Sequence, residues 1–404
     1  MNRKPTSWAL TIFAAISLLL ASCAQGAQQT ASVPQETTAP PAVVTEAPLT
    51  QTEAPAVATT QAPPATTTMA PVTETGQPTS QAGTQTLTVM THDSFAVSED
   101  VVKQFEQANN VTVKFLPSGD TGAALNKAIL SKDNPFADVF YGVDNTFLSR
   151  ALSEGIFESY DSPVLSDIPD TYQLDPQHRA LPVDFGDVCL NYDKAYFTDA
   201  GLAPPQSLDD LLDPKYKSLL VVENPATSSP GLAFLLTTIA NYGQDGYLDY
   251  WKGLVDNDVL AVNGWENAYY TEFTRSGGTR PIVVSYGSSP AAEVIFASEP
   301  LQEPPTAAIT GDTSCFRQIE FVGILQGTQN RDLAEAWVDF MLSPTFQEDM
   351  PLQMFVFPVN ENAKLNETFQ KFMEIPENTA QVDPETIAAN REKWIEAWTQ
   401  TVLR

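Results

Sequence analysis

The chain has 404 residues, with 21 Lys and Arg against 50 Asp and Glu, and its formal net charge at pH 7 is -29. This acidic balance argues against nucleic acid as a partner, because binding a phosphate backbone needs clustered Lys and Arg, and no five-residue stretch carries such a cluster. A hydrophobic share of 43% with 10% aromatic residues is ample for a packed core. The length allows two or three folded units, but the composition is uneven along the chain.

The N-terminus has the pattern of a secretory signal. Two basic residues precede an apolar run over residues 8–20, which is too short to span a bilayer permanently. The run ends in Leu-Ala-Ser-Cys, which resembles a bacterial lipobox. We therefore expect a lipoprotein signal peptide at residues 1–22, cleavage before Cys23 and acylation of its thiol, with the protein anchored outside the cytoplasm. The alternative is an ordinary signal with a chance cysteine.

The next segment is a low-complexity stretch. Residues 24–85 contain no Lys, no Arg and no aromatic residue, and they are rich in Thr, Ala, Pro and Gln. Such a segment buries too little apolar area to offset the entropy of ordering. We expect residues 23–85 to form a lipid-anchored, disordered tether, kept semi-extended by Pro, whose Thr side chains could accept O-glycans.

The folded part is expected at residues 86–404, and it begins with alternating strands and helices. Strands are predicted at residues 87–90, 111–115 and 137–141, with helices around residues 101–105 and 120–130. This alternation indicates an α/β fold with a largely parallel sheet. In such sheets ligands bind at the edge where the loops after the strands collect. These loops are residues 92–94, 118–121 and 144–145.

A second set of elements predicts a second α/β lobe. Strands are expected at residues 188–192, 218–223, 259–262 and 282–285, with a helix at 231–242. A strand at 319–324 and helices at 331–342 and 384–402 then follow. The last helix carries Trp394 and Trp398 one turn apart, a spacing that is typical of core packing.

The sequence offers no catalytic or metal-binding motif. Its two histidines are His92 and His178, and it has no His-Glu-x-x-His, Cys-x-x-Cys, Gly-x-Ser-x-Gly or phosphate-loop spacing. We therefore expect no catalytic residue, no metal and no cofactor, and a surface position for His178. Asp184 with Asp187 could do acid/base work, but in so acidic a chain we expect both carboxylates to be solvated or to cap helices.

Two cysteines remain in the folded part. Cys189 and Cys315 lie on or beside predicted strands, and in an exported protein a disulfide is the economical interpretation. Closing so long a loop could stabilise the fold by roughly 4 to 5 kcal/mol in the entropic model. The alternative is two buried free thiols.

Five short segments occur in an order that resembles a known family. They are Leu-Thr-Val-Met-Thr-His-Asp-Ser-Phe at 87–95, Ala-Asp-Val at 137–139 with Gly-Val-Asp-Asn at 142–145, Thr-Ser-Ser-Pro-Gly at 227–231, Gly-Trp at 264–265 and Ser-Tyr-Gly-Ser-Ser-Pro at 285–290. Together they resemble the thiamine-binding proteins of bacterial thiamine ABC transporters, and the likeness covers essentially the whole folded part. Each motif alone is weak evidence for the family, whereas five motifs in the expected order and spacing are strong evidence.

The resemblance implies a fold and a function. The fold would be that of a type II periplasmic binding protein, with two α/β lobes joined by crossover strands that close on a ligand. Lobe 1 would hold about residues 86–185 and 314–404, and lobe 2 about 186–313. The protein would be a monomeric, lipid-anchored receptor, not an enzyme, that binds thiamine or its phosphate esters and delivers them to an ABC permease with its ATPase.

The resemblance also implies site residues. Tyr286 and Trp265 would supply ring faces for stacking and for cation–π attraction to the thiazolium. Asp120 and Thr121 would hold the polar edge, with Asp120 opposite the thiazolium charge. Ser228 and Ser229 would offer hydroxyls and helix N-terminal N–H groups to the hydroxyethyl arm or a phosphate. The other expected ligand-binding residues are His92, Asp93, Gly287, Ser288, Ser289 and Phe355.

The chain departs from the family pattern at three positions. His92 stands where the family has a tyrosine, another expected aromatic falls at or near Ala292, and Phe355 stands where a tryptophan is expected. One or two stacking walls would therefore be smaller, which bears on affinity and phosphate preference more than on ligand class.

Two other functions stay open at this point. A ferric-ion receptor is one alternative, because that sister family uses adjacent tyrosines and Tyr269 and Tyr270 are neighbours. Helical spacing would, however, turn one of these rings to the core and the other to solvent. The other alternative is an exported enzyme or an adhesive surface domain, against which the lack of a nucleophile, base and orienting residue argues.

Overall fold

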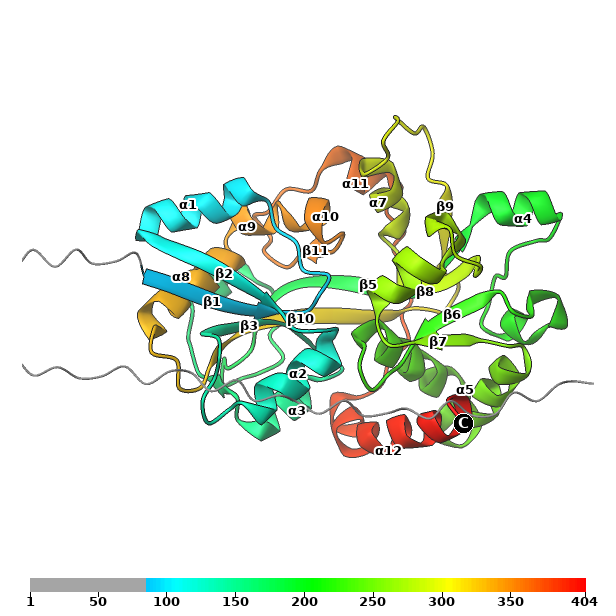
Figure 1. The fold of residues 1–404 in the computed structure, drawn as a ribbon, viewed down its shortest axis with the longest axis horizontal. Coiled ribbons are helices and arrows are strands. Elements are labelled where there is room, and N and C mark those ends of the chain that lie inside the picture. The colour runs from blue at the N-terminus through cyan, green and yellow to red at the C-terminus, as the bar shows by residue number, and fades with distance from the viewer. Residues whose placement is uncertain (1–84) are drawn as a thin grey trace, which may run out of the picture. The chain divides into compact units, whose positions relative to one another are not determined.

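The computed structural model describes residues 85–404, and these residues form a single mixed sheet of eleven strands with helices on both faces (Figure 1). The main strand order is β2-β1-β3-β10-β5-β8-β6-β7. The predicted signal peptide, Cys23 and nearly all of the predicted tether lie outside the described residues. No helix among residues 85–404 combines the length and the apolar character needed to cross a membrane.

The first lobe is built on three strands that pair in parallel. Its strands are β1 (Gln85–Thr91), β2 (Val111–Pro117) and β3 (Val139–Asp144), and its helices are α1 (Glu99–Asn109), α2 (Thr121–Leu130) and α3 (Leu148–Glu154). Helix α2 begins where expected, because the Asp120 side chain accepts a hydrogen bond from the N–H of Thr121. The predicted strand–helix alternation is confirmed here.

The second lobe repeats this arrangement at the other end of the sheet. Its parallel strands are β6 (Leu220–Glu223), β7 (Leu260–Val262) and β8 (Ile282–Tyr286). Its further elements are α4 (Lys194–Ala200), α5 (Ser229–Asp256), α6 (Trp265–Asn267), a π-helical turn at Ala268–Glu272, α7 (Ser289–Ile295) and β9 (Thr306–Ile309). Helix α5 is interrupted at Gly243, whose φ of 72° is not helical.

Two long strands join the lobes, and they correct the prediction of a largely parallel sheet. Strands β5 (Leu181–Asp193) and β10 (Phe316–Leu325) run side by side through the centre (Figure 1), and all their pairings are antiparallel. The short strands β4 (Phe157–Glu158) and β11 (Phe357–Pro358) pair with them. Parallel pairing needs a crossover between successive strands, and such crossovers occur only within each lobe, whereas β5 and β10 carry the chain between lobes in opposite directions.

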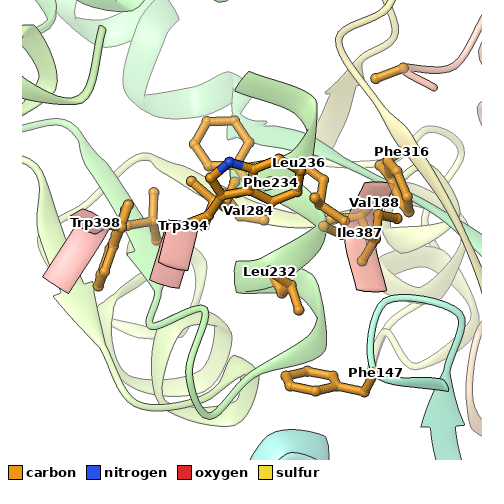
Figure 2. Packing of buried hydrophobic residues seen from close by; sticks show 14 of the residues in the cluster. Phe147, Val188, Leu232, Phe234, Leu236, Val284, Phe316, Ile387, Trp394 and Trp398 are labelled. Carbon is orange, nitrogen blue, oxygen red and sulfur yellow. The ribbon is translucent and has the colours of Figure 1, made fainter. Parts of the chain in front are cut away.

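The C-terminal helices complete both lobes. They are α8 (Arg331–Leu342), α9 (Pro344–Gln347), α10 (Met350–Gln353), α11 (Glu367–Phe372) and α12 (Pro384–Val402). Helices α8 and α12 have the predicted bounds. The prediction that Trp394 and Trp398 pack in the core is also confirmed, since both are buried and the ring of Trp398 meets that of Trp251 edge to face at 5.4 Å. Figure 2 shows both rings in one cluster with Phe234 of α5.

A disulfide also ties the two crossing strands together. Cys189 on β5 and Cys315, just before β10, form this bond, with their Cα atoms 4.4 Å apart. Both residues are buried, at 1% and 0% exposure. The bond therefore lies in the segment that connects the two lobes. The residue boundaries proposed above for the lobes stay a prediction.

Candidate functional site

A cavity of about 660 Å³ opens where the loops after the strands of both lobes meet. This volume lies within the range that is usual for small-molecule sites. Residues of the first lobe, of the second lobe and of β10 line it together, among them His92, Asp120, Trp265, Tyr286 and Glu320. For two of the three predicted loops, those after β1 and β2, the prediction that they gather at one edge is confirmed, because His92 and Asp120 both reach this cavity, whereas residues 144–145 do not line it.

One side of the cavity is formed by aromatic rings, which we call the ring side: Trp265, Tyr286 and Phe355. Two contacts fix the position of Trp265. Its Nε1 donates to Ser285 Oγ at 3.0 Å, and its ring stacks on Tyr269 with centroids 5.1 Å apart. The rings of Trp265 and Tyr286 meet at a steep angle of 63°, with centroids 6.5 Å apart. Two flat faces at this angle can enclose a planar ligand from two directions.

The Tyr286 ring owes its position to the neighbouring strand. It lies against Gly186 of β5, where a Cβ would come within 2.9 Å of Tyr286 Cδ1, so a larger residue there would push the ring away. Its hydroxyl donates to Gln318 Oε1 at 3.3 Å. Burial, followed by the nearby Glu320 carboxylate, raises the pKa of Tyr286 well above its usual value, so the phenol stays neutral.

Another part of the lining carries charge, and we call it the charged side: His92, Asp120 and Glu320. Asp120 links the two lobes, because its Oδ1 accepts the Thr121 N–H at 2.7 Å and its Oδ2 accepts the Trp265 N–H at 3.0 Å. Removal from water raises the pKa of Asp120, although these two N–H groups act in the opposite direction. Asp120 thus offers the cavity a carboxylate whose orientation is fixed by backbone donors from both lobes.

His92 and Glu320 lie side by side in the cavity lining, and we call this part of the lining the floor of the cavity. Its Nε2 lies 3.4 Å from Glu320 Oε1, and the two residues are only 6% and 4% exposed. Gly142 makes room for the imidazole, because a Cβ at that position would come within 2.3 Å of His92 Cδ2, and its φ of +108° suits glycine. Burial alone would lower the pKa of His92, but the attraction of Glu320, Asp120 and Asp93 raises it above its usual value.

The expectation that Asp184 and Asp187 are solvated or cap helices is wrong, since they are 0% and 1% exposed and both belong to a strand. Asp187 forms a two-pronged ion pair with Arg317, at 2.9 and 2.8 Å. Asp184 Oδ2 accepts the Tyr141 hydroxyl at 2.6 Å and lies beside Glu320. Both residues belong to the long crossing strand β5, whose two faces are covered in the folded chain, and this is the reason for their burial.

Eight of the twelve expected ligand-binding residues line the cavity. They are His92, Asp120, Thr121, Ser229, Trp265, Tyr286, Ser289 and Phe355. Among these, Thr121 donates its hydroxyl to the Gly142 carbonyl at 2.9 Å, and Ser289 Oγ lies 2.8 Å from Ser285 Oγ. The ligand contacts of all twelve residues stay a prediction.

The other four expected residues do not line the cavity: Asp93, Ser228, Gly287 and Ser288. Asp93 is exposed and accepts the Gly119 N–H at 2.6 Å. Gly287 donates to the Asp187 carbonyl at 2.9 Å, and the Ser288 hydroxyl donates to the Phe355 carbonyl. Ser228 is fully buried next to the Asp120 carboxylate.

Several lining residues escaped the sequence analysis, above all Glu320 and Phe296. Glu320 had a signal, because it is a charged residue within the apolar strand predicted at 319–324, where burial of an unpaired charge is costly. Phe296 is 63% exposed, follows α7 directly and meets the Phe355 ring at 4.9 Å. It stands four positions after Ala292, so an aromatic wall is present although Ala292 itself offers none.

The adjacent tyrosines both reach the cavity, but in different environments. Tyr269 is 6% exposed and donates its hydroxyl to Glu293 Oε1 at 2.9 Å, whereas Tyr270 is 58% exposed. The prediction that one ring faces the core and the other solvent is confirmed. Within residues 85–404, no group of three or more His, Cys, Asp or Glu side chains is arranged to hold a metal ion.

Comparison with known proteins gives a consistent result. The family model described as "Bacterial extracellular solute-binding protein" matches residues 134–376. The thiamine-binding periplasmic protein of Escherichia coli (strain K12) is 31% identical over 325 residues, which is 79% of this chain and 94% of that protein. A solved "Periplasmic thiamin binding protein" superposes with a TM-score of 0.70 at 28% identity, covering 81% of this chain and 99% of the other.

A more distant structure shares the fold alone. The ferric binding protein from Campylobacter jejuni superposes with a TM-score of 0.62 at 18% identity, covering 78% of this chain and 99% of that chain. The two-lobed fold with crossover strands is thus that of the type II periplasmic binding proteins.

Proposed function

The chain belongs to the bacterial extracellular solute-binding proteins, and from this premise we propose that it binds thiamine outside the cytoplasm and delivers it to an ABC importer. The relatives that support the role of a receptor carry thiamine binding in their names. The partners would be an ABC permease and its ATPase. Cys23 would carry the lipid anchor, and the monomeric binding domain would stand off the membrane on the tether.

The observation that carries the proposal is that the ring side and the charged side line the same cavity. Thiamine combines a flat aminopyrimidine with a thiazolium that carries a fixed positive charge. Trp265 and Tyr286 offer ring faces, whose attraction to a cation is worth on the order of 0.5 to 2 kcal/mol each. Asp120 and Glu320, of the charged side, supply negative charge in the same cavity. The residue types on the two sides therefore match the two chemical parts of this ligand.

Phosphate esters of thiamine belong to the proposal as further ligands. Arg275 is the one Lys or Arg among the described residues that line the cavity, and it lies on the second lobe with its Nη2 3.5 Å from Glu293 Oε2. A phosphate on the hydroxyethyl arm would be drawn toward this guanidinium and away from the carboxylates of the charged side.

Transport would use closure of the two lobes on the ligand. Strands β5 and β10 are the connections that would bend. A ligand that touches both lobes favours the closed form over the open one, and the permease would recognise the closed form. The Asp120 carboxylate already bridges the lobes through the Trp265 N–H. A cation bound between the lobes would therefore interact directly with the Asp120 carboxylate.

Calorimetric titration tests the proposal. The full chain, unfolded and refolded to remove carried-over ligand, is titrated with thiamine and then with its monophosphate and pyrophosphate. We expect submicromolar binding of one thiamine per chain. No heat with any of the three, from protein with an intact near-UV circular dichroism spectrum, would contradict the ligand. A visible tyrosinate–iron colour on adding Fe(III) would then favour Tyr269 and Tyr270 as ligands.

A further inference from the structure

Three carboxylates stand in a row on neighbouring strands beneath the cavity. Glu320 on β10 lies in register opposite Asp144 on β3 and opposite Asp184 on β5. All three are buried, with exposures of 4% or less. Like charges directly opposite each other on adjacent strands destabilise a sheet. The fold can therefore accommodate this row only if some of the carboxylates are protonated or if a cation lies beside them.

The polar atoms around this row are incompletely partnered. Asp144 Oδ2, Asp184 Oδ1 and His92 Nε2 have negligible exposure and no hydrogen bond of regular geometry. Burial and the adjacent Glu320 raise the pKa of Asp184 well above the usual value, which favours its protonated form. Burial likewise raises the pKa of Asp144 to about 6. Glu320 is the member of the row that lines the cavity, so it is the negative charge that an incoming ligand would meet.

His92 lies next to Glu320, with Nε2 3.4 Å from Oε1, so its protonated form places a cation beside this carboxylate. Charged and titratable groups face it from every element packed around it. They are Asp93 on its own loop, Asp120 before α2, Tyr141 on β3, Glu266 on α6 and Glu320 on β10, with Asp184 on β5 reached through the Tyr141 hydroxyl. Glu320, Asp120 and Asp93 attract a proton to the imidazole, and their attraction outweighs its burial.

We propose that Glu320 is the counter-ion for the positive charge of the ligand, and that His92 gives up its proton to solvent when the ligand enters. This inference rests on the proposed function, since it requires a cationic ligand. Without ligand, protonated His92 neutralises Glu320. A thiazolium brought beside Glu320 takes over that role and repels the imidazolium, so the proton leaves Nε2 through the open mouth of the cavity. One positive charge beside Glu320 is exchanged for another, so the net charge next to Glu320 does not change.

The exchange fixes the sign of the pH dependence. Because the carboxylates raise the pKa of His92 above its ordinary 6.5, the relevant range lies above pH 6.5. Below the pKa of the empty site, ligand must displace a proton and binds more weakly. Affinity therefore rises with pH, by up to about tenfold per pH unit for one proton, and levels off when His92 is neutral in the empty protein.

The experiment is calorimetric titration of the full chain with thiamine between pH 6.5 and 9, in two buffers of different ionisation enthalpy. The difference in heat between the buffers counts the protons released. The variants are His92→Gln and Glu320→Gln, which keep the approximate shape of each side chain. His178→Gln is the matched control, because His178 is the other histidine of the chain and pairs with Asp161 instead of lining the cavity.

We expect the wild type and His178→Gln to release up to one proton per thiamine and to bind more tightly as the pH rises. His92→Gln should release none, show a flat pH profile and bind more tightly than the wild type at pH 6.5. Glu320→Gln should bind at least tenfold more weakly at pH 9. Binding by the wild type without proton release, or release that persists in His92→Gln, overturns this inference alone. Absence of thiamine binding at every pH overturns the proposed function as well.

Discussion

The ring side and the charged side of the cavity differ in how completely the folded chain satisfies their polar atoms. On the ring side, Trp265 Nε1 and the Tyr286 hydroxyl both have partners within the protein. On the charged side, His92 Nε2 lacks a regular hydrogen bond. Behind this side, Glu223 is buried outside the cavity lining, both its carboxylate oxygens lack a partner, and burial raises its pKa well above the usual value. The comparison indicates that the ring side is complete without ligand, whereas the charged side retains buried charge that a cation would stabilise.

The largest effect is expected on the ring side. Replacing Trp265 or Tyr286 by Ala removes a ring face and its apolar contact, and we expect each change to weaken thiamine binding by more than tenfold. The dependence of affinity on pH should stay that of the wild type, because neither ring carries the exchanged proton. Calorimetry over a range of pH measures both quantities.

Phe136→Ala is the control for these two variants. Its ring is 55% exposed and does not line the cavity, so its loss should leave affinity unchanged. Unchanged affinity in both Trp265→Ala and Tyr286→Ala would contradict the assignment of the ring side.

An intermediate effect is expected at Asp120. Asp120→Asn keeps an oxygen that can accept the Thr121 N–H but removes the charge opposite a cation, so we expect thiamine affinity to fall by about three- to tenfold. The effect should shrink at high salt much less than a surface charge effect would, because the carboxylate is partly shielded from solvent. Titrations at low and high ionic strength give the comparison.

Asp249→Asn serves as the control, since Asp249 is an exposed residue of α5 that pairs with Lys252. It changes the net charge by the same amount without touching the cavity. Equal losses of affinity in the two variants would mean that only the overall charge of the protein matters.

The smallest effect concerns stability and not binding. Asp144 has a pKa near 3.8 when solvated and about 6 when folded. Between pH 3.8 and about 6 the folded state therefore binds a proton at Asp144 that the unfolded state does not. The stability contributed by Asp144 is therefore present at low pH and is lost as the pH rises through about 6. Asp144→Asn should remove this loss, which we estimate at about 1 to 2 kcal/mol between pH 4.5 and 7.5.

Urea unfolding of the ligand-free wild type and variant at these two pH values measures the difference. An equal change in unfolding free energy for both proteins would show that Asp144 does not take up a proton on folding. It would also remove one member from the carboxylate row on which the proton exchange depends.

Some parts of the fold were predictable because their signals are local. Helices α8 and α12 were predicted with their observed bounds, since their apolar residues recur at helical spacing and Pro384 stands at the first position of α12. The helix predicted around residues 120–130 likewise begins directly after Asp120, which is the type of residue that caps helices. These features depend on a few neighbouring residues, which the sequence displays directly.

The direction of the central strands was not predictable in the same way. Strand β5 and strand β10 each look like any other apolar run, and alternation of strands with helices suggested parallel pairing throughout. Whether two such strands run parallel depends on where the chain crosses from one lobe to the other. For the same reason the burial of Asp184 and Asp187 was not expected, because nothing near them in sequence indicates that both faces of β5 are covered.

The sequence by itself determined the α/β class, most of the strands and the longer helices. Periodicity, capping and loop position act over short stretches, so they can be read along the chain. Only the tertiary structure decided that Glu320 faces Asp144 on one neighbouring strand and Asp184 on the other, with His92 beside it. Such a juxtaposition is set by cross-strand register between segments far apart in the chain, and register is a property of the assembled sheet.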